Sequence, residues 1–214
     1  MKEKIVLVNG YLVRQLLDTD FAIMHRHGSG LVTPYDQKPY IPSGQRWVDY
    51  RHASEIRHLL QIEKKFAGLE GPYYSRQRDA LVQKLQTNRY RITEFMRKTE
   101  VHKNFQLIYI DGSLVRQFLD PEFVQGGHDL VYDYIPINQI WVDSLMDSRD
   151  HPHIILHETI ERELMSQGKS YDIAHDYAVA SEKESRRKAG GSYPGDSDRP
   201  NYRRHQLLKL LTIY

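Results

Sequence analysis

The chain alternates between short runs of apolar residues and longer segments in which apolar residues recur every three or four positions. The short runs are rich in β-branched and aromatic residues, which favour strands. Four of them stand out: residues 5–8, 106–110, 130–134 and 139–142. Two of these runs end at Asn9-Gly10 and Asp111-Gly112, dipeptides that are typical of tight hairpin turns. We therefore predict hairpins there, with residues 114–118 as a return strand; a single helical turn is the alternative for these residues.

The longer periodic segments predict helices, because a repeat near 3.6 residues places their apolar side chains on one face. They cover residues 53–67, 74–97, 151–167 and 171–187. The third segment has helix signals at both ends. Asp150 can cap its first turn, Pro152 suits that turn because the turn needs no backbone N–H there, and Gly168 can end the helix. Each set of strands is thus followed by two helices, which we expect to pair as a helical hairpin.

Two parts of the chain resemble each other in sequence. The segment V-N-G-Y-L-V-R-Q-L-L-D at residues 8–18 returns as I-D-G-S-L-V-R-Q-F-L-D at residues 110–120. The two tryptophans, Trp47 and Trp141, each begin a repeated W-V-D triplet. We infer an α+β fold with a tandem duplication, in which each half is a small antiparallel β-meander followed by a helical hairpin. The predicted units are residues 1–100, residues 101–188, and a linker with a C-terminal tail helix in residues 189–214.

Amino-acid composition restricts the possible metal ligands more than it restricts the possible binding partners. The chain has 214 residues, of which 40% are hydrophobic, so it can bury a core. Lys and Arg (30) nearly balance Asp and Glu (28), which gives no strong preference for nucleic acid or anionic membranes. Cysteine is absent, so disulfides and thiolate ligands are excluded. No apolar run is long enough to span a bilayer, and we expect a soluble, cytoplasmic protein.

Candidate metal ligands gather in the segment I-I-L-H-E-T-I-E-R-E-L at residues 154–164 and in the helix that follows it. On a helix, His157 and Glu161 lie four positions apart on one face, and Glu158 lies about 100° round the axis. If the next helix folds back, His175 joins them. We predict that His157, Glu161 and His175 bind Zn²⁺, with Glu158 as general base; nitrogen and oxygen donors leave Mn²⁺, Co²⁺ or Fe²⁺ as alternatives.

This pattern resembles the H-E-x-x-H motif of metallopeptidases, with Glu161 in place of the second histidine. A carboxylate ligand makes the ion a weaker Lewis acid, so a structural metal site is an alternative to a catalytic one. A site without metal is the other alternative, with His157 and Glu161 as an exposed pair and His175 packed in the core against Tyr171.

The first half lacks most of these residues. Its sequence matches Glu161 with Glu63, but it has leucine or glutamine in place of the two histidines and the base: Leu59, Leu60 and Gln77. We infer that the repeated unit folds without metal. A carboxylate that is present in both halves is also consistent with a structural role for Glu161.

Further candidates lie around this segment. Gly126-Gly127-His128 can form a backbone turn that aims His128 at the helix, as a fourth ligand or as a donor to an oxyanion; an exposed histidine in a turn is the alternative. Glu182 lies seven positions after His175 and is a ligand or a supporting partner. Asp143 and Arg162 are candidates for supporting roles. We predict surface positions for His151 and His153, which lie near the helix start.

The string H-E-T-I-E-R-E-L-M-S-Q-G-K-S-Y-D-I-A-H, preceded by G-G-H-D-L-V-Y-D-Y-I-P-I-N-Q-I-W-V-D, resembles a group of small uncharacterised phage and prophage proteins. The resemblance covers residues 106–187. It implies a common unit with a metal site and supplies no reaction. If the protein is phage-encoded, its compartment is the cytoplasm of the host cell.

Three hypotheses for function follow. The first is a metal-dependent, zinc-type hydrolase or peptidase-like protein. The second is a noncatalytic phage or host-interaction scaffold, in which metal is structural or absent. The third is nucleic-acid binding through basic residues of the first helical hairpin: Lys64, Lys65, Arg76, Arg78 and Lys84. The sequence predicts neither the substrate, nor a protein partner, nor the oligomeric state.

Overall fold

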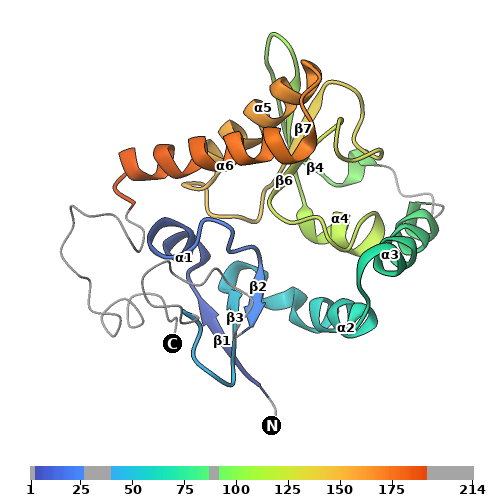
Figure 1. Ribbon diagram of the computed structural model, residues 1–214, viewed down its shortest axis with the longest axis vertical. Coiled ribbons are helices and arrows are strands. Elements are labelled where there is room, and N and C mark those ends of the chain that lie inside the picture. Colours follow the sequence, from blue (N-terminus) through green and yellow to red (C-terminus); the bar gives the residue numbers. More distant parts are fainter. Residues whose placement is uncertain (1–2, 27–39, 87–91, 192–214) are drawn as a thin grey trace.

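The computed structural model describes residues 3–26, 40–86 and 92–191, which form two small sheets with helices packed around them (Figure 1). The predicted α+β fold class is confirmed. The predicted tail helix lies outside the described residues, which end shortly after the last helix. Among the helices described, none is long and apolar enough to cross a membrane.

The two sheets share one arrangement. In the first sheet the order is β1-β3-β2, with β1 parallel and β2 antiparallel to β3. In the second the order is β4-β5-β7-β6, and β5, β7 and β6 repeat that pattern beside the added edge strand β4. This similarity is compatible with the predicted duplication. The strands are β1 (Lys4–Val8), β2 (Met24–Arg26), β3 (Gln45–Asp49), β4 (Met96–Val101), β5 (Gln106–Ile110), β6 (Gly126–His128) and β7 (Gln139–Asp143).

The predicted hairpin turns and return strand are wrong: a short helix follows the first strand of each half, α1 (Gly10–Leu16) and α4 (Gly112–Phe118). Asn9 and Asp111 cap these helices through side-chain oxygens that accept backbone hydrogen bonds. The glycines are needed for space, since a Cβ on Gly112 would lie 2.0 Å from the Asp143 carboxylate. Asparagine, aspartate and glycine are found at helix starts as well as in turns. Here the buried Asp143 carboxylate beside Gly112 favours the helix start.

The predicted antiparallel meander is therefore also wrong. The chain crosses over through α1 or α4 before it returns to the sheet, so β1 pairs with β3, and β5 with β7, in parallel. Residues 130–134 form turns rather than a strand. The strand that precedes them is β6, which contains two glycines and lacks the apolar composition that predicts strands.

Two helices follow each sheet, but only the second pair forms the predicted packed hairpin. Helices α5 and α6 pack against each other along their length, whereas α2 and α3 meet near Phe66 and Tyr74 and then diverge (Figure 1). Helix α3 lies beside α4 instead, where Arg78 pairs with Asp120 and Glu122. The remaining elements are η1 (Tyr50–Glu55), α2 (Ile56–Phe66), α3 (Gly71–Gln86), η2 (Ile92–Glu94), α5 (His151–Ser166) and α6 (Tyr171–Lys188).

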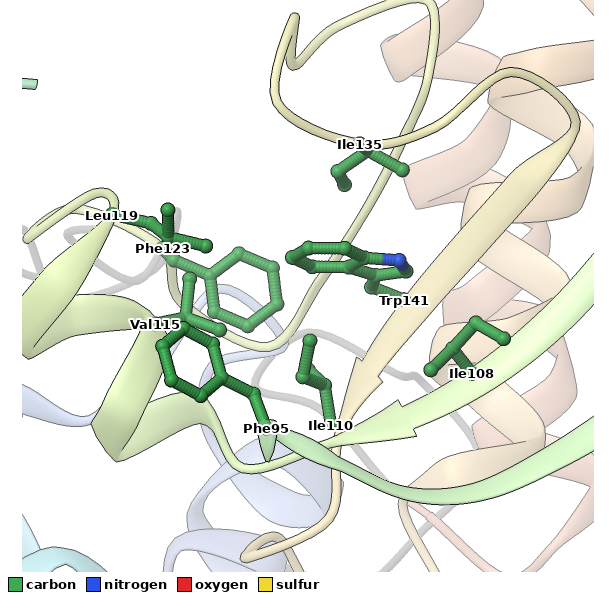
Figure 2. Packing of buried hydrophobic residues seen from close by; sticks show 8 residues of the cluster. All are labelled: Phe95, Ile108, Ile110, Val115, Leu119, Phe123, Ile135 and Trp141. Carbon is green, nitrogen blue, oxygen red and sulfur yellow. The ribbon is translucent and has the colours of Figure 1, made fainter. Parts of the chain in front are cut away.

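Alternate side chains of β5 and β7 support two separate apolar clusters. On one face, Ile108, Ile110 and Trp141 pack with residues of α4 and the loops (Figure 2). On the other face, Leu107, Ile140 and Val142 pack with Ile154 of α5. The second cluster anchors α5 on the sheet, and α5 in turn carries the candidate site.

Two fully buried arginines join the halves. Arg14 of α1 pairs with Asp49 of its own half and with Asp150, the residue that precedes α5 in the other half. Arg116 of α4 pairs with Asp143 of its own half and with Glu55, the residue that precedes α2. The contacts between the halves are therefore reciprocal.

Candidate metal centre

The site lies between α5, α6 and β6. Helix α5 is held on the sheet by Ile154, and α6 approaches α5 closely because two of its inward residues, Ala174 and Ala178, are small and fully buried. This packing orients His157 and Glu161 of α5 toward His175 of α6.

The structure brings together the three predicted metal ligands. Ligand atoms of His157, Glu161 and His175 all lie within 4.8 Å of one another. The Glu161 Oε1 atom is 2.8 Å from His175 Nδ1 and 3.8 Å from His157 Nε2. A 3.8 Å separation is too long for a hydrogen bond, and it is close to the spacing of two donor atoms that share one ion.

His157 is oriented by Glu182, whose Oε2 lies 3.0 Å from His157 Nδ1. The Nδ1–H donates to this carboxylate, so Nε2 is the atom that faces Glu161. Burial disfavours a charged imidazole, but Glu161 and Glu182 outweigh burial and raise the pKa of His157 to about 10. At neutral pH without metal the ring is protonated, and a metal ion would take the place of the Nε2 proton.

His128 lies beside the predicted ligands, and with Glu158 and Glu161 it forms a second group of side chains that could hold a metal ion. It is fully buried, its Nδ1 accepts a hydrogen bond from the Leu130 N–H, and its Nε2 lies 3.0 Å from Glu161 Oε2. With Nδ1 accepting, the proton is on Nε2, which donates to Glu161. His128 thus holds one carboxylate oxygen of Glu161 and leaves the other directed toward His157 and His175.

The two glycines before His128 provide space rather than a turn. Neither has a positive φ, and both belong to β6. A Cβ on Gly126 would lie 2.8 Å from Glu158 Oε1 and 2.9 Å from Ile154 Cγ2. Gly126 therefore lets α5 lie directly against the strand, whereas a Cβ on Gly127 would lie 2.5 Å from the Tyr132 ring.

Glu158, the predicted general base, lies beside the predicted ligands. Its side chain is buried, and one of its oxygens lies within 4.8 Å of ligand atoms of His128 and Glu161. Burial raises the pKa of Glu158 to about 8; His157 opposes this shift, and the carboxylates of Glu161 and Glu182 add to it. Among the described residues it accepts no hydrogen bond, so its oxygens are available to a water molecule or substrate.

In the first half, two arginines surround the carboxylate that matches Glu161. The Glu63 side chain pairs with Arg46 and lies 3.8 Å from Arg26. Strand register places these arginines at the positions of Ile140 and His128. The first half thus has cationic side chains where the second half has an apolar residue and a neutral donor.

Several supporting residues were not predicted or were placed wrongly. His153 is buried and bonded to Ser185, so the predicted surface position is wrong. Asp143 belongs to the Arg116 pair rather than to the site, and Arg162 holds Asp129 in the loop after β6. Arg186 and Asp150 extend the contacts of Glu182; the i,i+4 spacing of Glu182 and Arg186 was the one available sequence signal.

In comparisons with family models, curated proteins and solved structures, nothing matched this chain. The resemblance of residues 106–187 to phage and prophage proteins therefore stays a prediction.

Proposed function

We propose that this protein is a metal-dependent hydrolase, which binds one divalent ion, Zn²⁺ first among the candidates, through His157, Glu161 and His175. Glu158 is its general base, and His128 and Glu182 orient the ligands. The observation that carries the proposal is the contrast between Glu161 and Glu63. Glu63 is neutralised by two arginines. Within the described part of the chain, Glu161 has ion-pair partners among histidines alone, and a bound metal ion would take the place of the proton that His157 carries.

The ligand set also supports a catalytic site. Two histidines and one glutamate are a known ligand set of catalytic zinc, in which a water molecule takes the fourth position. The His175 side chain is 40% exposed, compared with 5% for Glu161, so the site opens to solvent on the α6 side. A bound divalent ion would polarise that water. Glu158, buried beside the ligands, would accept the proton in its ionised form, which predominates above its pKa of about 8.

Other roles have less support. The first half has the same strand arrangement without this site, which is the observation in favour of a noncatalytic scaffold. Of the basic residues considered for nucleic-acid binding, Arg78 is already held by Asp120 and Glu122. A salt-dependent binding assay would test the contribution of the others, Lys64, Lys65, Arg76 and Lys84.

The test of metal binding uses protein purified without chelator or metal-affinity tag. Elemental analysis of the parent protein should give about one equivalent of metal per chain. Metal should be lost from Glu161→Gln and from the double variant His157→Ala with His175→Ala. Glu63→Gln is the matched control. This variant should keep the metal bound by the second half, because Glu63 pairs with arginines and is not a ligand. A parent protein without stoichiometric metal would refute the proposal.

The test of catalysis is Glu158→Gln. This variant should keep the metal and lose activity on peptide and ester substrates by roughly 10²–10⁴-fold, the usual effect of removing a general base. Metal binding by the parent protein without hydrolysis of these substrates would favour the noncatalytic scaffold. Activity that survives in Glu158→Gln would exclude Glu158 as the base.

A further inference from the structure

A continuous line of buried charged side chains runs from the metal centre to the first half. His157 Nδ1 donates to Glu182, and the other oxygen of Glu182 accepts a hydrogen bond of 2.9 Å from Arg186 Nε. Arg186 Nη1 donates to Asp150 Oδ1 over 2.7 Å. Each of Glu182, Arg186 and Asp150 is less than 5% exposed, so solvent does not screen these contacts.

Asp150 is held in turn by Arg14 from the first half. Arg14 donates through Nη2 to Oδ2 over 2.7 Å and through Nε to Oδ1 over 3.2 Å, a two-point contact that fixes the plane of the carboxylate. The neighbouring Gln15 donates from Nε2 to the backbone carbonyl of Arg186 over 3.1 Å. Helix α1 therefore holds Arg186 both through Asp150 and through its main chain.

We propose that the site-less first half positions the metal centre of the second half, with Arg14 as the positioning residue. This inference rests on the proposed metal binding. Arg14 touches no ligand, and it acts through Asp150, Arg186 and Glu182 on the ring of His157. When the two-point contact is lost, Asp150 and Arg186 can shift, and Glu182 no longer holds the Nε2 atom of His157 in one direction.

Arg116 provides a matched control within the same chain. It is as buried as Arg14 and makes the reciprocal two-point contact, through Nε and Nη2, with Glu55 at the start of α2. The helix that it holds has Leu59 in place of His157. Loss of either contact thus disturbs the junction of the halves, but only the Arg14 contact leads to a ligand.

The experiment compares Arg14→Lys with Arg116→Lys in the full chain, because lysine keeps the charge and loses the two-point geometry. Zinc affinity is measured by competition with a chromogenic chelator, and ligand geometry by the visible absorption of the Co²⁺-substituted protein. Arg14→Lys should bind zinc about tenfold more weakly and change the Co²⁺ spectrum, as outer partners of metal ligands commonly do. Arg116→Lys should match the parent protein in both. Equal affinities and identical spectra in the two variants would overturn the proposal.

A measurement on the parent protein covers the case in which Arg14→Lys fails to fold. The side-chain Nε–H signals of Arg14 and Arg116 can be followed by NMR during zinc titration. The Arg14 signal should move as the site fills, and the Arg116 signal should stay in place. Zinc binding with an unmoved Arg14 signal would overturn this inference alone. A parent protein that binds no zinc would overturn the proposed function together with it.

Discussion

At the scale of single residues, Gly126 sets how closely α5, which carries the candidate metal centre, can approach the sheet. The strand residue lies against Glu158 and Ile154 of α5, with no space for even one methyl group. A glycine in a strand usually weakens it, and this one is explained by the close approach of the helix. The candidate site therefore requires a residue without a side chain at position 126, although this residue contributes no ligand or reactive group.

Gly126→Ala should destabilise the protein and displace Glu158. The added Cβ would force α5 away from β6, because Ile154 Cγ2 cannot rotate away as the end of the Glu158 side chain can. Such overpacking costs about 1–3 kcal/mol of unfolding free energy. Urea denaturation measures the loss, and the activity assay measures the effect on Glu158. Unchanged stability and unchanged activity would contradict this description of the packing.

At the scale of elements, the long helices were predictable and the short elements were not. Helices α5 and α6 run for 16 and 18 residues, so their apolar period has several turns in which to appear, and the cluster of His157, Glu161 and His175 follows from their pairing. Helix α4 has 7 residues, too few for its period to be distinguished from that of a strand. Its start depends on a buried aspartate from β7, which lies far along the chain.

The rest of the site depends on contacts that no local pattern encodes. His128 donates to Glu161 because the Leu130 N–H occupies its other nitrogen, and this follows from the turn after β6. Likewise, α3 departs from α2 and lies beside α4, where Arg78 pairs with Asp120 and Glu122. The sequence could therefore predict which side chains meet on a helix pair, but not the orientation that distinguishes a ligand from its supporting partner.

The helix cap at Asp111 tests the corrected assignment of α4. Its Oδ1 accepts hydrogen bonds from the N–H groups of Ser113 and Leu114, and its Oδ2 pairs with the exposed Arg97. Asp111→Ala should lower the unfolding free energy by about 1 kcal/mol, whereas Asp111→Asn should be near neutral, because asparagine caps as well and the surface ion pair contributes little. Thermal denaturation distinguishes these outcomes. An equal loss in both variants would assign the effect to Arg97.

At the scale of the whole molecule, the reciprocal arginine pairs link the two halves. Each arginine reaches a carboxylate on its own sheet and a carboxylate at the start of a long helix in the other half. Removing one residue of such a buried ion pair leaves the other charge buried without a partner, which is strongly destabilising. The free energy of unfolding should therefore depend on whether these carboxylates are ionised. The pKa of Glu55 defines the pH range in which this dependence can be measured.

Glu55 should stabilise the protein at neutral pH and lose this effect in acid. Burial alone would raise its pKa, but hydrogen bonds with His52 and Arg116 outweigh burial and lower it from 4.5 to about 2. The folded state thus binds fewer protons than the unfolded state between these values, so stability falls as pH falls from about 4.5 to about 2. The shift corresponds to about 3 kcal/mol at neutral pH. Urea denaturation of the parent protein and of Glu55→Gln should differ by about this amount at pH 7 and converge near pH 2. A difference that stays constant across this range would show that Glu55 acts through packing rather than through its charge.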